Sequence, residues 1–477
     1  MACIDADVCV IGGGPAGSSF ALRLAQLGHT VVVLEREVFP RLHVGEAFTA
    51  GIHVPLSVLG VAQEVYRSGV LQTQGTIRAW EHREAERAAP ATGRPGMAVD
   101  RGVFDQLLLD QARASGVRVL QPASPIEVTQ TGERWQIAVR GSSPIERVSA
   151  RFVADASGRV AALRRLDNRD KRRGGPGCPP GPTRAETTIA FAGYWRLSRD
   201  PDSMTRLEAA PEGWYWGTPL PGNRFVGMAF GEAGTPRSTP PEAHYLELVQ
   251  QSALLKEVLT GARLERVVVR DATCRAAREP IGPAWIRLGE ASVAIDPLSS
   301  SGVQKALQTS LSGAIVVHTQ LTCPDRAEAA MTFYRDDQRS SVTQHARWAG
   351  AAYAQVRRFE DRPFWRRRST ASASDGQQVS FQSPVAGQQV RVAGDTRLVP
   401  VPCVVGNLID VRMAIAHPRL DRPVAFLDEI PVATLLESIR GAATDEELAE
   451  RWTPLVPIAR GRAVARWLIE RGILVGA

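Results

Sequence analysis

The sequence predicts an α/β fold with three parts: a domain of parallel strands and helices, an antiparallel sheet inserted into that domain, and a small α+β domain at the C-terminal end. Apolar strands alternate with amphipathic helices near the start of the chain and again beyond residue 275, which is typical of a parallel sheet covered by helices. Short alternating strands dominate residues 186–273. Beyond residue 389, two strands precede three short helical patterns, and these predict the appended domain.

The first forty residues predict a strand–turn–helix–strand unit. An apolar strand, an amphipathic helix and a second strand occupy residues 8–34. Gly12, Gly14 and Gly17 fall in the turn, where a side chain would obstruct a pyrophosphate that approaches the backbone N–H groups of the helix start. Glu35 ends the second strand, where a carboxylate can accept hydrogen bonds from ribose hydroxyls. The unit therefore predicts a Rossmann-like dinucleotide-binding domain.

The composition argues against several classes of protein. The 477 residues carry a net charge of +7, and almost all the cations are arginine. No helical pattern shows a basic stripe with interleaved aromatics, so arginines spread over solvated faces are favoured over a nucleic-acid site. The six cysteines show neither disulfide nor metal spacing. Without a signal peptide or a long apolar run, the chain is expected to be soluble, cytoplasmic and not bound to a membrane.

Two later segments resemble conserved motifs of flavoprotein monooxygenases. Residues 153–159, which include Asp155, resemble the second motif of that family. Residues 289–302 resemble its Gly-Asp-Ala…Asp-Pro…Gly segment, with Glu290 in place of the family's aspartate. The resemblance covers about residues 5–345 and implies FAD, bound in the Rossmann-like domain of a group A flavoprotein monooxygenase.

The same resemblance assigns roles to residues outside the glycine turn. It implies that Asp296 lies near the ribityl chain and that the helix starting at Gly302 faces the flavin pyrimidine edge, where its positive end favours an electron-rich flavin. Arg41 and Arg101 resemble family arginines near the diphosphate and isoalloxazine, although either could be a surface arginine paired with a carboxylate. The predicted cofactor-binding residues are Gly12, Gly14, Pro15, Ala16, Gly17, Glu35, Arg36, Arg41, Arg101, Asp155, Asp296, Ser301, Gly302 and Val303.

A closer resemblance is to the branch that contains flavin-dependent halogenases. Residues 41–47 resemble its Arg-x-x-x-Gly-Glu-Ser/Ala segment, and residues 296–302 match its Asp-Pro-Leu-x-Ser-x-Gly turn. Residues 214–219 resemble its Trp-x-Trp-x-Ile-Pro signature, with Thr218 for the isoleucine. On residue type alone, the two tryptophans would be same-face strand residues that pack a sheet core.

Two groups that halogenases use are missing. Those enzymes depend on a lysine after the Gly-Glu segment, and no lysine precedes Lys171. Tryptophan-type halogenases also place a glutamate in the Asp-Pro-Leu turn, where this chain has Ser299. The resemblance therefore implies a FAD-dependent monooxygenase that uses NADH or NADPH and O2. It would act through a C4a-hydroperoxyflavin in a site that excludes water and holds an electron-rich ring.

A general base beside the ring would assist its deprotonation. His43, His53 and Glu46 are candidates for that base by position, although a lone histidine is more often structural. The predicted catalytic residues are His43, Glu46, Trp216 and Ser300, and no metal site is predicted.

The C-terminal region bears on the substrate. Helical patterns at residues 432–440, 444–452 and 460–471 resemble the small winged-helix domains that recognise leader peptides, although a structural or dimerising tail would show them too. A halogenase-like core without halogenase groups, joined to such a tail, resembles flavoprotein monooxygenases that mature tryptophan-derived quinone cofactors. It implies a tryptophan side chain in a polypeptide partner as substrate. The alternatives are a halogenase or hydroxylase of a small or carrier-bound aromatic, and a flavin-binding peptide chaperone or scaffold.

These patterns set the expected domain boundaries. The FAD-binding domain is expected at residues 1–85, 100–165 and 275–360, and the substrate-binding sheet at residues 86–99 and 185–274. The remaining segments are a flexible loop at 166–184, a linker at 361–388 and the C-terminal domain at 389–477. The sequence leaves the oligomeric state open.

Overall fold

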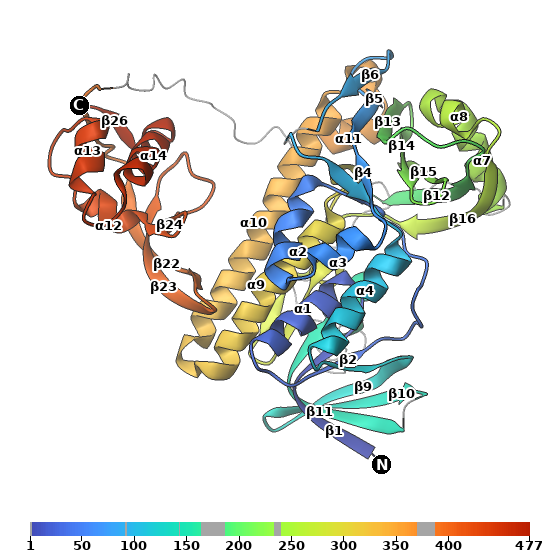
Figure 1. Ribbon diagram of the computed structural model, residues 1–477, viewed down its shortest axis with the longest axis horizontal. Helices are drawn as coiled ribbons and strands as arrows, with labels where there is room; N and C mark the ends of the chain where they lie inside the picture. Colours follow the sequence, from blue (N-terminus) through green and yellow to red (C-terminus); the bar gives the residue numbers. More distant parts are fainter. Residues whose placement is uncertain (1, 91–92, 143, 164–186, 233–239, 370–386) are drawn as a thin grey trace. The chain divides into compact units, whose positions relative to one another are not determined.

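The structure is a computed structural model that describes residues 2–90, 93–142, 144–163, 187–232, 240–369 and 387–477 (Figure 1). The expected flexible loop at 166–184 lies outside the described residues. The chain forms two compact units, one of residues 1–318 and 334–374 and one of residues 319–333 and 375–477. No helix in the described part of the chain combines the length and apolar character that a membrane crossing needs.

A mostly parallel sheet forms the base of the first unit. Its strands, in order, are β18 (Ile281–Gly282), β19 (Trp285–Arg287), β11 (Ile145–Asp155), β1 (Ala2–Ile11), β2 (Val31–Leu34) and β8 (Arg118–Leu120). From β19 to β8 each strand pairs with its neighbour in parallel. Helices α1 (Pro15–Gln26) and α4 (Arg101–Ala114) pack against each other beside this sheet. The predicted strand–turn–helix–strand unit is therefore β1, α1 and β2.

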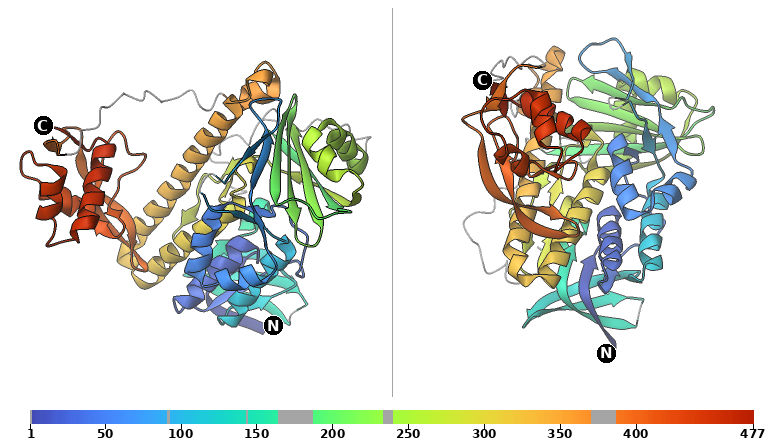
Figure 2. Two further views of the ribbon diagram at one scale, coloured as in Figure 1. Left: turned by 45° about the horizontal axis from the view of Figure 1, so that its top comes forward. Right: turned by 60° about the vertical axis from the view of Figure 1, so that its left-hand side comes forward.

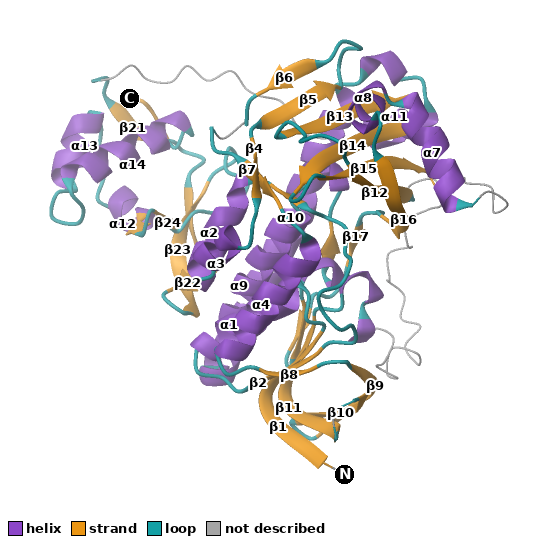
Figure 3. Ribbon diagram, turned by 45° about the vertical axis from the view of Figure 1, so that its right-hand side comes forward, coloured by secondary structure: helices purple, strands orange, loops and turns teal. Residues whose placement is uncertain are grey.

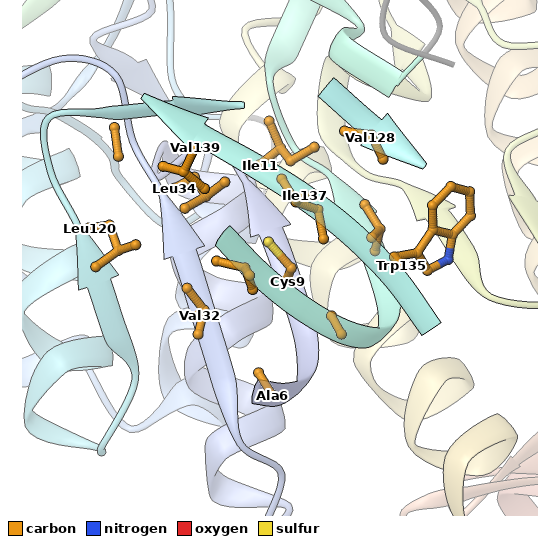
Figure 4. Close-up of a cluster of buried hydrophobic side chains, with 14 of the residues drawn as sticks. Ala6, Cys9, Ile11, Val32, Leu34, Leu120, Val128, Trp135, Ile137 and Val139 are labelled. Carbon is orange, nitrogen blue, oxygen red and sulfur yellow. The ribbon is translucent and has the colours of Figure 1, made fainter. Parts of the chain in front are cut away.

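An antiparallel pair, β9 (Ala123–Thr131) and β10 (Arg134–Gly141), extends from β11 and closes the core of this sheet. Figure 4 shows the buried side chains between the two layers, among them Cys9, Val32, Ile137 and Trp135. Cys9 is fully buried, and burial raises its pKa to about 12, as the apolar strand predicts. Trp135 packs its ring into this core while its Nε1 donates to the backbone oxygen of Ala284 at 2.8 Å.

A second sheet has seven strands. In order, they are β16 (Arg263–Asp271), β12 (Thr188–Arg196), β15 (Arg224–Glu232), β14 (Gly213–Leu220), β13 (Met204–Ala210), β5 (Gly75–Ala79) and β6 (Glu86–Ala88) (Figure 3). Five of these strands lie between β11 and β19 in the chain, while β5 and β6 come from before β8. The expected boundaries place the residues of β5 in the FAD-binding domain instead. Neighbouring strands are antiparallel, except that β5 and β13 are parallel. Helices α7 (Pro241–Gln251) and α8 (Ala253–Leu259) cover one face (Figure 2). The predicted α/β fold with an inserted antiparallel sheet is confirmed.

Short elements connect the two sheets. They are β3 (Ala47–Phe48), β7 (Gly96–Ala98) and β4 (Leu71–Thr73), which form a small sheet, the helices α2 (His53–Leu59) and α3 (Ala62–Arg67), and the pair β17 (Arg275–Ala276) and β20 (Val293–Ala294). The stretch expected to be a linker begins with helix α11 (Pro363–Ser369). Its Phe364 and Trp365 are buried against Trp80 and Tyr353 of the same unit.

Two long helices follow the inserted sheet, α9 (Gly302–Thr322) and α10 (Ala327–Ala354). The turn between them belongs to the second unit. In the same unit, the hairpin of β22 (Arg397–Val405) and β23 (Leu408–Ala416) contacts the last turn of α9, where the Ile409 N–H donates to Thr319 Oγ1 at 2.9 Å.

The rest of the second unit surrounds Trp452, which is fully buried. Its helices are α12 (Val432–Glu437), α13 (Asp445–Arg451) and α14 (Ile458–Glu470), and its short strand pairs are β21 (Val390–Val392) with β26 (Leu474–Gly476) and β24 (Phe426–Leu427) with β25 (Ile430–Pro431). Thr444 and Glu447 form a capping box at the start of α13. Three short helices thus occur where helical patterns predict them, and the winged-helix resemblance stays a prediction.

Candidate active site

A cavity of about 950 Å³ lies within the first unit. One part of its wall is the glycine turn and the segments that carry the flavoprotein motifs, and another is the antiparallel sheet with Trp214, Trp216, Met228 and Phe230. A volume of this size holds a large organic ligand. The cavity therefore brings the predicted cofactor turn and the predicted substrate wall into one space.

The glycine turn leaves no room for side chains. Gly12 has φ of +104°, and a Cβ there would lie 2.5 Å from the Ala156 backbone oxygen. A Cβ on Gly17 would lie 1.8 Å from the Gly12 oxygen. Helix α1 begins after Gly14, which offers no capping side chain, so the first N–H groups remain available to an anion. Gly17 permits this close packing without lining the cavity itself.

Glu35 supports the turn from the neighbouring strand. Its side chain is buried, and its two oxygens accept hydrogen bonds from the N–H groups of Gly13 at 2.7 Å and Glu37 at 2.8 Å. Arg41 lies 3.9 Å from Glu35 and lines the cavity, with its buried Nε left without a hydrogen-bond partner. Arg36 also lines the cavity, with an exposed side chain 3.3 Å from Glu37.

Arg101 fixes the segment that follows Arg41. Its guanidinium forms two hydrogen bonds with Asp105, at 2.9 and 3.1 Å, and donates to the Val44 oxygen at 2.8 Å. His43 lines the cavity in this segment, and burial together with the charge of Arg101 lowers its pKa to about 4. His43 is therefore neutral near pH 7. The same low pKa makes His43 a weak base, because burial and the charge of Arg101 disfavour its protonated form.

Glu46 lies behind the cavity wall. It is buried and accepts hydrogen bonds from the Tyr194 hydroxyl and, at 2.8 Å, from the Gly45 N–H. Burial raises the pKa of Glu46, and burial and the Glu46 charge raise that of Tyr194. Since Tyr194 belongs to β12, this bond ties the segment at 43–46 to the antiparallel sheet. The arrangement suits Glu46 to positioning that segment.

Asp155 also lies behind the wall. Its carboxylate accepts from the N–H groups of Ser157 at 3.1 Å and Leu163 at 2.9 Å, and so holds the turn that follows β11. That turn carries Arg159, whose Nε donates to Glu290 Oε1 at 3.2 Å. Arg159 and Glu290 both line the cavity. The glutamate side chain at position 290, which is longer than the aspartate of the family motif, thus reaches Arg159 as a partner.

The turn before α9 is held by Asp296. This side chain accepts from the Leu298 N–H at 2.9 Å and from the Tyr353 hydroxyl at 3.1 Å. Burial raises the pKa of Asp296. Ser300, in the same turn, lines the cavity with φ of +48°, a conformation that is costly for a residue with a Cβ and is frequent at functional sites. The Ser301 hydroxyl bonds the Ser299 oxygen at 2.8 Å outside the cavity wall.

Lys305 is a cavity residue that the motifs do not identify. It is buried in the first turn of α9, and its Nζ donates to the backbone oxygens of Gly289 at 3.1 Å and Val293 at 2.6 Å. Burial lowers its pKa to about 7. Lys305 follows Gly302 by three residues at the start of the same helix. This spacing is the one signal in the sequence from which its position at the cavity could have been predicted.

The substrate side of the wall is aromatic. Trp214 and Phe230 stack with ring centroids 3.8 Å apart, and the Trp214 Nε1 is buried without a hydrogen-bond partner. Trp216 lies on the same face of β14, because strand side chains alternate. Such a wall suits a flat aromatic ring.

The residues present fit FAD. The glycine turn, the free N–H groups of α1, Glu35 and Arg41 would hold its adenosine diphosphate part, and the start of α9 with Gly302 and Val303 would meet the flavin part. Among the described residues, no cluster of His, Cys, Asp and Glu side chains could hold a metal ion.

Most of the predicted site residues therefore meet at one cavity. The predicted residues in its wall are Gly12, Gly14, Pro15, Ala16, Glu35, Arg36, Arg41, His43, Arg101, Trp216, Asp296, Ser300, Gly302 and Val303. Gly17, Glu46, Asp155 and Ser301 lie behind it. His53 is hydrogen bonded to the Tyr66 hydroxyl away from the cavity, which argues against its role as a base.

Comparison with known proteins agrees with the geometry. Residues 7–166 match the FAD dependent oxidoreductase family. Tryptophan 2-halogenase of Chondromyces crocatus is 28% identical over 378 residues, covering 75% of this chain and 69% of the relative. Flavin-dependent halogenase armH3 of Armillaria mellea is 27% identical over 396 residues, covering 75% and 76%.

Two solved structures share the fold over nearly the whole chain. The peptidyl tryptophan dihydroxylase QhpG, essential for tryptophylquinone cofactor biogenesis, has a TM-score of 0.72 at 22% identity, covering 98% of this chain and 99% of its own. CmlS, a flavin-dependent halogenase, has a TM-score of 0.76 at 22% identity, covering 99% and 96%. With the cavity described above, these relations identify the chain as a FAD-dependent oxidoreductase that is similar to flavin-dependent halogenases.

Proposed function

We propose that the protein is a monooxygenase that hydroxylates an electron-rich aromatic ring, with a tryptophan side chain of a polypeptide as its substrate. NADH or NADPH supplies the electrons and O2 the oxygen atom. Reduced FAD, when bound, supplies the chemistry that activates O2. The observation that carries the proposal is the single cavity that joins the glycine turn to the wall of Trp214, Trp216 and Phe230.

The protein's own residues would position and shield the reaction. The aromatic wall would hold the ring by stacking and exclude water. His43 lines the same wall in its neutral form, which can accept a hydrogen bond from the ring, although its pKa of about 4 makes it a weak base near pH 7.

The position of the Lys305 amine in the cavity favours hydroxylation over halogenation. Among the described residues, Lys305 is the lysine that lines the cavity, and Gly289 and Val293 hold its ammonium through their backbone oxygens. No described lysine therefore extends from the wall toward the aromatic side, where an amine would have to carry an activated halogen.

The deciding experiment supplies the FAD-loaded protein with O2 and a tryptophan-bearing polypeptide, and uses either NADH, NADPH or chemically reduced FAD as electron source. We expect a mass gain in units of one oxygen on the tryptophan, and none on a matched polypeptide with phenylalanine in its place. No mass gain with any electron source would contradict the proposal.

The second candidate function is halogenation of an aromatic substrate, which the 28% identity to a tryptophan 2-halogenase favours. The same assay with bromide separates the two functions by product mass. A bromine-bearing product would replace the hydroxylase proposal with this one.

We also propose that the second unit binds the polypeptide partner. Its own core around Trp452 supports an independent binding module. Deleting residues 387–477 should abolish oxidation of the polypeptide while oxidation of free indole continues. Equal loss of both activities would contradict this role.

A further inference from the structure

Strand β16 is an edge of the antiparallel sheet: within the described residues it pairs with β12 alone (Figure 1). Its register places Arg266 opposite Tyr194 and Arg270 opposite Ala190. Tyr194, Ala190 and Val268 belong to the core cluster on the cavity side of the sheet. Because strand side chains alternate, Arg266 and Arg270 project from this same side.

The edge leads into the cavity. Arg270, Asp271 and Ala272, at the end of β16, line its wall. At the other end, a register shift near Leu264 interrupts the pairing with β12, and such a shift bends a strand. The regular edge therefore runs from Arg266 to Asp271 and ends at the cavity.

Two positive charges on this edge are uncompensated. The carboxylate of Glu265 is engaged by Arg196 at 3.1 Å, and that of Asp271 lies 3.7 Å from Arg159. Arg266 and Arg270 are exposed, and neither forms an ion pair with a carboxylate of the described residues. The Val269 carbonyl on this strand accepts a hydrogen bond from the Arg270 guanidinium at 3.0 Å, a local bond that an added strand could replace. An exposed strand edge can pair through its N–H and C=O groups with an extended segment of another chain.

We propose that the edge of β16 from Arg266 to Asp271 binds an extended, acidic segment of the polypeptide substrate as an added strand. This inference rests on the proposed function and names the surface that presents the reacting residue. Arg266 and Arg270 lie four residues apart, about 13 Å along a strand. The matching segment carries two carboxylates four residues apart and an aromatic residue two positions beyond, next to Ala272.

Charged residues on an edge strand can instead serve only to prevent unwanted pairing. The two roles make opposite predictions for peptide binding. A protective edge repels all strands, whereas a docking edge selects acidic ones.

The test uses the full-length, FAD-loaded protein and fluorescently labelled twelve-residue peptides. The test peptide has aspartates two and six positions away from a single tryptophan, and it is made in two versions, with the aspartates before or after the tryptophan. The control for each version has asparagine at both positions. We expect the control peptide to bind with a Kd about tenfold higher or more. Backbone amides of residues 266–271 should exchange hydrogen more slowly when the aspartate peptide is bound.

The variants Arg266→Glu and Arg270→Glu should each raise the Kd of the aspartate peptide about tenfold, and a lysine peptide should restore binding to Arg266→Glu. Arg118→Glu is the matched control, since Arg118 is an exposed arginine on β8, an edge strand of the other sheet. It should leave the Kd unchanged. Bound FAD and the unfolding temperature show whether each variant is folded.

The measurements of peptide binding and of tryptophan oxidation distinguish failure of the docking edge from failure of the proposed function. Equal affinity for the aspartate and asparagine peptides, an unchanged Kd after charge reversal, or no binding at all would overturn the docking edge. If binding depends on charge as expected but the tryptophan gains no oxygen, the proposed function fails while the docking edge stands. If the tryptophan gains oxygen and charge reversal changes nothing, the docking edge fails alone.

Discussion

Arg159 donates a hydrogen bond to Glu290 across 131 residues of sequence, and this pair joins the two later flavoprotein motifs at the cavity wall. Glutamate in place of aspartate is therefore matched to its partner, because the added methylene brings the carboxylate within 3.2 Å of the guanidinium. The side chains remain 23% and 41% exposed, so solvent screens the pair and its contribution is small.

Glu290→Asp should weaken FAD binding about two- to fivefold, because the shortened side chain loses Arg159 at a partly exposed site. FAD fluorescence quenching measures the Kd. Glu290→Gln, which keeps the length and loses the charge, is the control. Tighter FAD binding by the aspartate variant would show that the pair with Arg159 does not support the site.

Gly17→Ala should abolish FAD binding, since the new Cβ would lie 1.8 Å from the Gly12 oxygen and displace the turn. The absorbance of the purified protein at flavin wavelengths measures the bound cofactor. Gly394→Ala is the control, because a Cβ there meets no atom within 4 Å and Gly394 lies in the second unit. Normal flavin content in the Gly17 variant would refute the packing argument.

Tyr194→Phe should destabilise the protein by about 1–3 kcal/mol, because it leaves the buried Glu46 carboxyl without its hydroxyl donor. Urea unfolding measures the change. Tyr215→Phe is the matched control, as Tyr215 is a buried tyrosine of the same sheet whose hydroxyl has no hydrogen-bond partner among the described residues. A double variant with Glu46→Gln should recover part of the loss. Equal losses for the two tyrosine variants would leave no special role for Glu46.

His43 should make the FAD-free protein less stable in acid. Its folded pKa of about 4 is below its unfolded value of about 6.5, so the unfolded chain binds more protons between these values. The free energy of unfolding therefore rises with pH across this window, by up to about 3 kcal/mol, and levels off above it. In His43→Gln this contribution disappears, and in His82→Gln, an exposed control, it remains. Identical pH profiles for His43→Gln and the parent would disprove the assignment.

Lys305 should make FAD binding depend on pH. Its pKa of about 7 rises when an anionic cofactor enters the same cavity, so binding takes up a proton above pH 7. The Kd for FAD is expected to increase by up to about tenfold per pH unit above that value. Titrations from pH 6 to 9 should show a flat profile for Lys305→Met and an unchanged slope for Lys256→Met, an exposed lysine of α8. A slope that survives in Lys305→Met would exclude this lysine.

Local sequence predicted the parts of the site that are formed by consecutive residues. The turn of Gly12, Gly14 and Gly17 and the carboxylate of Glu35 follow from about thirty residues that fold on each other. Tyr194 and Glu46 are 148 residues apart, and Tyr353 reaches Asp296 from 57 residues away. These contacts depend on how two sheets and a helix meet, which a spacing pattern does not encode. The sequence motifs predict that Glu46 and Asp155 contact a ligand. The structure places both behind the cavity wall, because spacing along the chain does not show which side chains face the cavity.

Every described residue that lines the cavity belongs to the first unit. The second unit therefore contributes no described residue to the cavity wall, so a change confined to that unit leaves the wall as it is.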